Sequence, residues 1–444
     1  MDYDNKLESV AVLGAAGKMG SGILLLTAVE MADLSLKPEN RQRTFTIQAI
    51  DISAQGLAGL MKYLRAQVTR IAEKKMVWLR SVYSDRADLV ENGQIIQEYV
   101  FDVLNIVRPS IRIEAAFDCQ LIFEAIKEDP ELKKMIFRKI DAANPHKPWY
   151  FTNTSSIPIA ELGTDAGLDG RIIGFHFYNP PAVQKLVELI CAKNTAPGLE
   201  SFALEYAGRL GKLVVKSNDQ AGFIGNGHFM RDALHGMSEV LRLGPDIPLV
   251  ESIWMVNKVS QDYLVRPMGI FQLIDYVGLD VVTYIMQVMQ PHYPGEVLYS
   301  ELLMRFLEMG IKGGQNSDGS QKDGILKYSK GKPSGVFDPE TGQYIPAEHF
   351  IQTCENRLGP LPELFQPWKQ VVGSNNKDDF FEGLFTELKS MNTLGARLAL
   401  AYAGKSKEIG KQLVTSGVAQ SDEDVNSVLL TGFFHTLGPI NHFV

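Results

Sequence analysis

Short apolar runs alternate with longer amphipathic stretches through the first half of the chain. SVAVLG predicts a buried strand, and GAAGKMGSGILLLTAVEMA predicts the turn and helix after it. Further apolar runs predict strands at FTIQAIDIS, QLIFEAI, WYFTNTSS and RIIGFHFYN, with helical stretches between them. Alternation at this spacing is typical of a doubly wound α/β fold with a parallel sheet. We expect this domain to occupy residues 1–216.

The stretch from 52 to 112 interrupts the alternation with helical periodicity. From residue 57 onward it has the pattern of a long helical insertion, and several of its polar positions are basic. These positions are Lys62, Arg65, Arg70, Lys74, Lys75 and Arg80.

Beyond about Ser217 the pattern is helical. HFMRDALHGMSEVLRL and QLIDYVGLDVVTYIMQVM begin an expected all-α domain at 217–330, and the turn-rich tract after GIKGG separates it from another helical region at 346–444. VESIWMVNKVS followed by RPMGIF resembles DEDVNSVLLTG followed by HTLGPI, so we interpret the last region as a second, partial copy. Unrelated amphipathic helices are the alternative interpretation.

Composition narrows the class of protein. The 444 residues are 45% hydrophobic and 22% charged, as in soluble globular proteins, and no apolar run is long enough to span a bilayer. The acidic start MDYDNKLES has no signal-peptide pattern, and three scattered cysteines favour a reducing compartment, so we expect a cytoplasmic protein. Metal-ligand spacing is missing, and the net charge of −8 argues against nucleic acid.

A glycine-rich loop lies where the first strand meets its helix. Gly14, Gly17 and Gly20 suit a tight turn, a close approach of the backbone to a pyrophosphate, and helix packing. Asp51 ends the next strand, where it can bind a ribose 2′-hydroxyl and repel a 2′-phosphate. The pattern therefore predicts a Rossmann-like site for NAD. The alternative is that Asp51 caps the following helix, with Ser53 as a rival cap.

Five polar side chains between 151 and 226 suit the oxidation of an alcohol. They are Asn153, Ser155, His176, Glu188 and Asn226. Removal of a hydride from carbon requires loss of the hydroxyl proton, and histidine, titrating at roughly pH 6.5, is the usual base. A carboxylate on its other nitrogen would orient the ring, provided the chain turns back between His176 and Glu188. The alternative is a core histidine beside a surface carboxylate.

Six segments in order resemble the L-3-hydroxyacyl-CoA dehydrogenase family. They are VAVLGAAGKMGSGI, LIFEAIKEDPELKK, NTSSI, GFHFYNPPAVQKLVELI, VKSNDQAGFIGN and RPMGIFQLIDYVGLD, which together span roughly residues 8 to 285. The resemblance implies an NAD-dependent enzyme that interconverts 3-hydroxyacyl-CoA and 3-ketoacyl-CoA.

The resemblance also implies roles for individual residues. His176 matches the catalytic base and Glu188 its orienting carboxylate, while Ser155 and Asn226 match residues at the substrate oxygens. Lys74 matches a lysine that meets the CoA moiety. The cofactor-contacting positions are Gly14, Gly17, Lys18, Met19, Gly20, Asp51, Ala125, Glu128, Lys133, Asn153 and Asn179.

The chain departs from the family at two positions. Its glycine loop, GxxGxxG, has one residue more than GxGxxG, and Gly227 follows Asn226 where the family usually has arginine. ADLSLKPENRQRTF, between the loop and Asp51, has the pattern of an inserted polar loop. Two other functions stay open: a related dehydrogenase of a non-CoA hydroxy acid, such as carnitine or a sugar acid, and a dinucleotide-binding protein without activity.

The two helical regions also bear on assembly. If residues 346–444 cover the apolar face of 217–330, pairing between chains through that face becomes unnecessary. We therefore expect a monomer, or a homodimer that uses another surface.

Overall fold

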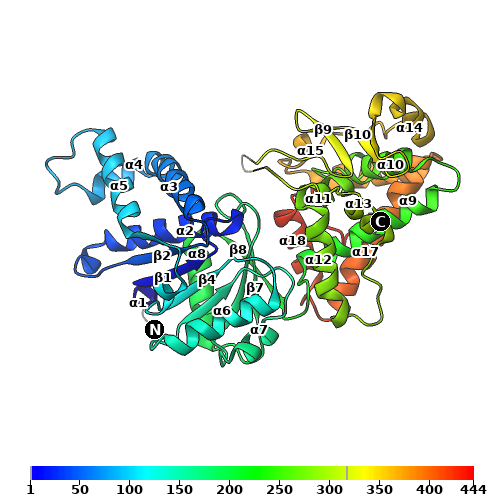
Figure 1. Cartoon of the computed structure of the whole chain (residues 1–444). Coiled ribbons are helices and arrows are strands. Elements are labelled where there is room, and N and C mark those ends of the chain that lie inside the picture. Colours follow the sequence, from blue (N-terminus) through cyan, green and yellow to red (C-terminus); the bar gives the residue numbers. More distant parts are fainter. Residues whose placement is uncertain (1–2, 317–318) are drawn as a thin grey trace. The chain divides into compact units, whose positions relative to one another are not determined.

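The computed structural model describes residues 3–316 and 319–444. The chain divides into two compact units, Met1–Asp219 and Gln220–Val444 (Figure 1). We describe each unit separately.

The first unit is built on an eight-stranded sheet in the order β3-β2-β1-β4-β5-β6-β7-β8 (Figure 1). Every neighbouring pair is parallel except β6 with β7. The expected doubly wound sheet is confirmed, with this antiparallel pair as an addition. The strands are β1 (Ser9–Leu13), β2 (Thr46–Ile50), β3 (Val107–Ser110), β4 (Leu121–Glu124), β5 (Trp149–Thr152), β6 (Ile172–Phe177), β7 (Leu186–Cys191) and β8 (Leu213–Asn218).

Helices and sheet share one apolar core in this unit. The central strands β4, β5 and β6 are buried at every position, as expected for a sheet covered on both faces. The helices outside the insertion are α1 (Tyr3–Lys6), α2 (Lys18–Ser35), α6 (Pro130–Ala143), α7 (Ile159–Ala166) and α8 (Pro197–Arg209), with 3-10 turns at Pro38–Asn40 and Ile113–Ala116.

Two stretches of this unit differ in detail from the sequence analysis. The insertion is helical in α3 (Ala54–Lys74), α4 (Met76–Val82) and α5 (Asn92–Ile106), but its last residues form the edge strand β3. VRPS is too short to show a strand period of its own, and its pairing with β2 provides the missing hydrogen bonds. The expected polar loop after α2 is shorter than predicted, because its first residues, ADLS, continue the helix.

The second unit is mainly helical, as expected, around a core of its own. Its helices are α9 (Gly225–Leu243), α10 (Leu249–Lys258), α11 (Ile270–Val277), α12 (Leu279–Met289), α13 (Glu301–Glu308), α14 (Ile351–Leu358), α15 (Trp368–Val371), α16 (Lys377–Ser390), α17 (Leu394–Thr415) and α18 (Asp422–Gly432). One π turn, Val259–Tyr263, extends α10, and 3-10 turns lie at Gln290–His292 and Ala347–His349.

A small antiparallel sheet is the exception to the all-α expectation. It consists of β9 (Leu326–Ser329), β10 (Lys332–Asp338) and β11 (Gln343–Pro346). From the sequence alone this region shows only turn signals, because glycines and polar residues dominate it. The turn signals were correct, since Lys330 and Gly331 both have positive φ at the tip of the β9–β10 hairpin. The short strands between the turns were missed.

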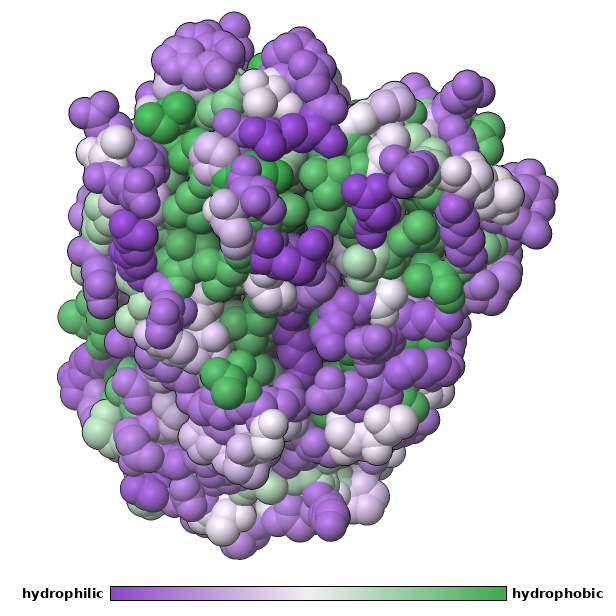
Figure 2. All heavy atoms as spheres, turned by 90° about the vertical axis from the view of Figure 1, so that its right-hand side faces the viewer, coloured by the Kyte–Doolittle hydropathy of each residue, from purple (hydrophilic) through white to green (hydrophobic). Residues whose placement is uncertain are grey.

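Helices α9 and α17 hold the two helical regions together. Tyr402 Oη on α17 donates to the carbonyl of Asp232 on α9, and the Arg266 guanidinium binds both Asp232 and Ser406. Residues from both regions belong to one apolar cluster, so the expected packing of the two regions on each other is confirmed. The face of this unit in Figure 2 has hydrophobic patches among hydrophilic side chains, mainly in the upper half of the view.

Candidate active site

The β6–β7 hairpin brings His176 and Glu188 together. Residues 178–185 between the strands are too few for a crossover helix, so the chain reverses and the strands pair antiparallel. In this register His176 lies directly opposite Glu188. The chain therefore turns back as the proposed pairing requires.

The geometry of the pair is that of an oriented base. His176 Nδ1 lies 3.0 Å from Glu188 Oε2, and the carboxylate is fully buried. Tyr178 Oη donates to the same oxygen at 2.8 Å. Burial, and then the charge of Glu188, raise the pKa of Tyr178 well above its usual value, so its phenol stays protonated and remains a donor. One carboxylate oxygen thus serves an imidazole and a phenol.

Asn153 and Ser155 lie just beyond β5, in the loop that leads to α7. Asn153 Oδ1 accepts a hydrogen bond from the backbone N–H of Phe177 at 2.8 Å, which ties this loop to the end of β6. Glu128 also fixes the loop, because its Oε1 accepts hydrogen bonds from Thr154 Oγ1 at 2.6 Å and from Ser155 N at 2.9 Å. Ser155 and His176 therefore project from two adjacent, mutually fixed strand ends.

Lys133 supports that loop from inside the unit. Its ammonium group is 2.6 Å from Glu124 Oε1 and 3.1 Å from Glu128 Oε2, and its side chain is only 1% exposed. Burial alone would lower the pKa of Lys133, but the two carboxylates raise it above its usual value, so the lysine stays charged. Lys133 thus positions Glu128, and through Glu128 the Ser155 loop.

The glycine loop has the close approaches expected of a dinucleotide cradle. Gly14 has φ +75°, and a Cβ there would lie 2.5 Å from the carbonyl oxygen of Ala125. A Cβ on Gly20 would lie 2.0 Å from the carbonyl oxygen of Gly14, so only glycine lets α2 pack on the loop. Gly17 is the N-cap of α2 and has no side chain over the first turn, where Lys18 and Met19 follow. A cofactor pyrophosphate fits this cradle.

Asp51 takes part in the same loop. Its carboxylate accepts a hydrogen bond from the backbone N–H of Ala16 and another from Ser53, each at 3.0 Å. The side chain of Ser53 caps α3 by accepting from Gly56 N at 2.9 Å. The rival cap is therefore the actual cap, and the half-buried Asp51 lies against the glycine loop.

Two further predicted contact residues of the first unit are at its surface. Lys74 is exposed in the last turn of α3, and Asn179 is half-buried in the turn between β6 and β7.

Asn226 belongs to the second unit, where it is the second residue of α9. The glycine after it has a packing reason. A Cβ on Gly227 would lie 3.0 Å from Leu413 of α17, and its carbonyl accepts a hydrogen bond from Arg231 Nη1 at 2.7 Å. A side chain at 227 would require Leu413 of α17 to move by a few tenths of an ångström, and Arg231, one turn later, places a guanidinium against the same backbone.

Tyr178 and Glu124 are the site residues that sequence analysis missed. Glu124 is fully buried, and it accepts a hydrogen bond from Thr152 Oγ1 at 2.6 Å in addition to the one from Lys133. A signal for it existed: a charged residue inside the apolar run LIFEA must be paired if the run is a buried strand. Tyr178 gave no such signal, because a tyrosine at a strand end is ordinary.

Other candidate chemistry is missing from the described residues. Nowhere in 3–316 or 319–444 do three or more His, Cys, Asp or Glu side chains gather as metal ligands would. Within the same ranges no helix has the length and apolarity to cross a membrane. His228 Nε2 lies 3.2 Å from Ser406 Oγ, so it links α9 to α17.

Comparison with known proteins places these features in one family. Residues 9–220 match the model of the 3-hydroxyacyl-CoA dehydrogenase NAD-binding domain, and residues 249–323 match that of the 3-hydroxyacyl-CoA dehydrogenase C-terminal domain. A probable 3-hydroxybutyryl-CoA dehydrogenase of Deinococcus radiodurans is 32% identical over 46% of this chain and 72% of its own length. A probable 3-hydroxyacyl-CoA dehydrogenase of Caenorhabditis elegans is 29% identical over 72% of this chain and 93% of its own.

A solved structure extends the likeness to the C-terminal region. The 3-hydroxybutyryl-CoA dehydrogenase of Escherichia coli K12 has a TM-score of 0.63, at 19% identity, over 98% of this chain and 90% of its own. At that identity the likeness concerns the fold, and it includes the helices beyond residue 323.

Proposed function

We propose how this chain, which belongs to the 3-hydroxyacyl-CoA dehydrogenase family, performs the NAD-dependent oxidation of its 3-hydroxyacyl-CoA substrate. In the proposal His176 is the general base and Glu188 its orienting carboxylate. The single observation that carries it is the 3.0 Å approach of His176 Nδ1 to the buried Glu188. A proton on Nδ1 that is donated to Glu188 makes Nε2 the basic nitrogen.

The proton steps then follow from the chain's own groups. Nε2 of His176 takes the proton of the 3-hydroxyl as the carbon–oxygen double bond forms, and the hydrogen on carbon 3 leaves with its electron pair. NAD, when bound, supplies the acceptor for that hydride. Glu188 stabilises the resulting imidazolium at short range in a buried site. In the reverse reaction the imidazolium returns the proton to the 3-keto oxygen.

We assign positioning of the substrate to Ser155 and Asn226. The Ser155 hydroxyl, fixed through its backbone to Glu128, would hydrogen-bond the reacting oxygen. Asn226, on α9 of the second unit, would hold the thioester carbonyl. Lys74 and the other basic residues of the insertion would attract the anionic CoA moiety.

The proposed cofactor contacts use the cradle of the first unit. The first turn of α2 offers backbone N–H groups to the pyrophosphate, and Asp51 accepts from the ribose 2′-hydroxyl. Asn153, Asn179, Ala125 and the Glu128–Lys133 pair complete the expected set. Gly14 and Gly20 support the proposed cradle, because a Cβ at either position would collide with the backbone.

The two alternative functions have less support. A dehydrogenase of a non-CoA hydroxy acid would have no use for the basic insertion, and the relatives reported above are named for acyl-CoA substrates. An inactive binding protein would have no use for the His176–Glu188–Tyr178 arrangement.

We further propose that the protein acts in the cytoplasm as a monomer or a homodimer. Helix α9 packs on α17 of the same chain, and this packing supports the proposal because the apolar face is then covered without a second chain. Light scattering of the full chain would measure its mass, and a tetramer or larger assembly would contradict the proposal.

His176→Gln tests the assignment of the base. We expect kcat for reduction of acetoacetyl-CoA by NADH to fall roughly a thousandfold, because general base catalysis by a positioned side chain contributes about 10²–10⁴. NADH binding, measured by fluorescence, should be unchanged. His146→Gln is the matched control, since His146 is exposed in the same unit. Near wild-type turnover of His176→Gln would remove His176 from the mechanism.

A further inference from the structure

The second unit contains a pocket that the reaction above does not use. It encloses about 950 Å³ and lies between the end of α10, the π turn after it, α11, the β9–β10 hairpin and α15. Pockets for small organic ligands and cofactors have volumes of roughly 300–1,000 Å³. This pocket is therefore large enough for an organic molecule rather than a single ion.

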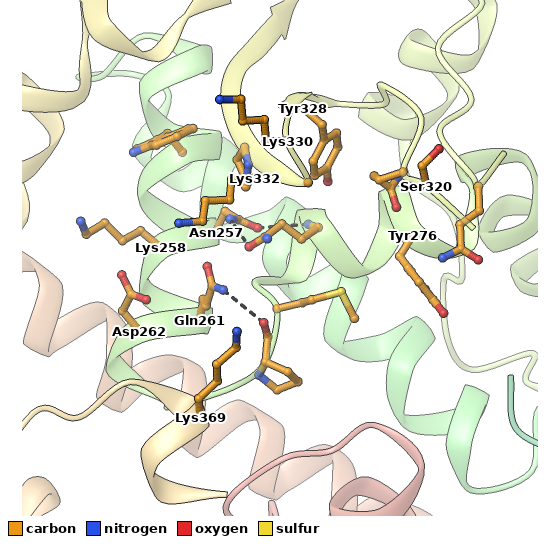
Figure 3. Close-up of a pocket in the computed structure, with 18 of the residues that line it drawn as sticks. Asn257, Lys258, Gln261, Asp262, Tyr276, Ser320, Tyr328, Lys330, Lys332 and Lys369 are labelled. Carbon is orange, nitrogen blue, oxygen red and sulfur yellow. Dashed lines mark hydrogen bonds between the residues drawn. The ribbon is translucent and has the colours of Figure 1, made fainter. Parts of the chain in front are cut away.

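One side of the pocket is strongly cationic. Lys258, Lys330, Lys332 and Lys369 line it, and among the described lining residues Asp262 is the one carboxylate (Figure 3). These four lysines come from three separate parts of the chain, so no single helix or hairpin accounts for their convergence. The whole protein has a net charge of −8, which makes a local excess of four cations over one anion contrary to its average.

Most of this positive charge is not neutralised by the protein itself. Lys258 forms an ion pair with Glu355 at 3.1 Å. Lys330, Lys332 and Lys369 have no ion pair within the described part of the chain. Ammonium groups that converge on a concave surface attract multiply charged anions, of which phosphates are the commonest in metabolism.

The opposite side of the pocket is uncharged and partly aromatic. Tyr276 and Ser320 line the pocket and lie on the other side of the view from Lys258 and Lys369 in Figure 3. Tyr328 and Met268 also line it, as does Gln321, whose amide Nε2 donates to the backbone carbonyls of Asp275, Gly314 and Lys322. An aromatic ring offers a stacking surface to a planar base, and amide and hydroxyl groups suit the polar edges of such a base. The pocket therefore has one side for phosphates and another for a base.

The walls are fixed by the protein's own hydrogen bonds. Asn257 Oδ1 accepts from the backbone N–H groups of Phe271 and Gln272, each at 3.1 Å, which fastens α10 to α11. Asp275 of α11 accepts from Leu326 N at 2.9 Å and from Tyr328 Oη at 3.0 Å, which fastens the hairpin. A pocket whose walls are already ordered loses little conformational entropy when a ligand binds.

We propose that this pocket binds an adenosine phosphate that carries at least two phosphate groups. The lysines would hold the phosphates, and Tyr276 with its neighbours would hold the base. This chemistry occurs both in free adenine nucleotides and in the 3′,5′-phosphorylated adenosine of CoA. The proposal goes beyond the dehydrogenase reaction and stands whether or not the assignment of His176 holds.

Calorimetry on the full chain tests the proposal. The protein is first saturated with NADH, so that the dinucleotide site is filled, and is then titrated separately with ADP, adenosine 3′,5′-bisphosphate and inorganic tripolyphosphate. We expect one further site for at least one of the two adenosine compounds. Tighter binding of ADP identifies a free nucleotide as the source, and tighter binding of the bisphosphate identifies the adenosine end of a CoA molecule other than the substrate at Lys74.

Two double variants locate the binding. Lys330→Gln/Lys332→Gln should raise Kd at least tenfold, whereas Lys322→Gln/Lys327→Gln, which removes the same charge from the same region outside the pocket, should change it less than twofold. Equal thermal unfolding midpoints would show that both variants are folded. No binding in the presence of NADH, equal losses in both variants, or tripolyphosphate binding as tightly as the adenosine compounds would overturn the proposal.

Discussion

Glu188 in the first unit and Asp275 in the second are both fully buried carboxylates, but their surroundings differ. Glu188 receives an imidazole and a phenol, which are side chains, and the imidazole can gain and lose a proton. Asp275 receives the backbone N–H groups of Ile325 and Leu326 and the phenol of Tyr328. Burial alone therefore does not identify a carboxylate of the active site. The partner that can change its charge does.

The backbone approaches Asp275 closely at a glycine. A Cβ on Gly324 would lie 2.1 Å from Asp275 Oδ1, so the backbone itself closes over this carboxylate. Its partners among the described residues include no cation, and burial raises the pKa of Asp275 to about 7 in spite of its three donors. Asp275 fixes the hairpin to α11, whereas the role that we propose for Glu188 is to stabilise a charge that appears during the reaction.

The largest expected effect comes from removing the charge of Glu188. Glu188→Gln should lower kcat by roughly a thousandfold, because an amide cannot stabilise the imidazolium. Steady-state assays with acetoacetyl-CoA and NADH measure it. Asp275→Asn is the matched control and should leave kcat within about twofold. If Asp275→Asn lowered kcat as much as Glu188→Gln, the distinction between the two carboxylates would fail.

Asp275 should instead control stability as a function of pH. Its pKa is higher in the folded protein than in the unfolded chain, so the folded state holds this proton more tightly, and stability falls as pH rises from about 4 through 7. Between pH 5 and 8 this group should remove about 2–3 kcal/mol from the free energy of unfolding. Urea denaturation followed by tryptophan fluorescence measures the change, and Asp275→Asn should flatten it. An unchanged pH dependence in Asp275→Asn would contradict this account.

Asp51 is intermediate between Glu188 and Asp275, because it accepts hydrogen bonds from two backbone N–H groups but is only half-buried. We expect a preference for NAD over NADP in kcat/KM, since the carboxylate repels a 2′-phosphate. Asp51→Ala should narrow that preference about tenfold, the effect of one charge-assisted hydrogen bond of about 1.4 kcal/mol. Assays with both cofactors decide it, and an unchanged ratio would place Asp51 in a purely structural role.

The smallest effect is expected for Tyr178→Phe. Without the phenol, Glu188 keeps its charge for His176 alone and stabilises the imidazolium more strongly. The acidic limb of the pH profile of kcat/KM for alcohol oxidation should therefore move to higher pH, with a loss of about two- to fivefold near pH 6.5 and little loss above pH 8. A uniform loss across the profile would mean that Tyr178 only holds the hairpin in place.

Periodicity and glycine placement were sufficient to predict the sheet and the dinucleotide cradle, whereas the roles of His176 and Glu188 were predicted from the resemblance to the family. Periodicity and glycine placement act locally, within one strand or one turn. Partners elsewhere in the chain determine the edge strand β3 and the small sheet of the second unit. They also determine that Glu128 binds both Lys133 and the Ser155 loop. No local pattern distinguishes VRPS from a loop, and only the fold shows that Lys133 is enclosed by two carboxylates.

The contact between α9 and α17 has a consequence for how this protein can vary. In a symmetric pair of chains every substitution at the interface occurs twice, once in each copy. Here the two helices belong to one chain and have different sequences, so a change at Gly227 can be answered by a change at Leu413 alone. Each side of the contact can therefore change without the same substitution occurring on the other side. Gly227, beside Asn226, packs against Leu413 of a different helix, and not against the same glycine of a second chain.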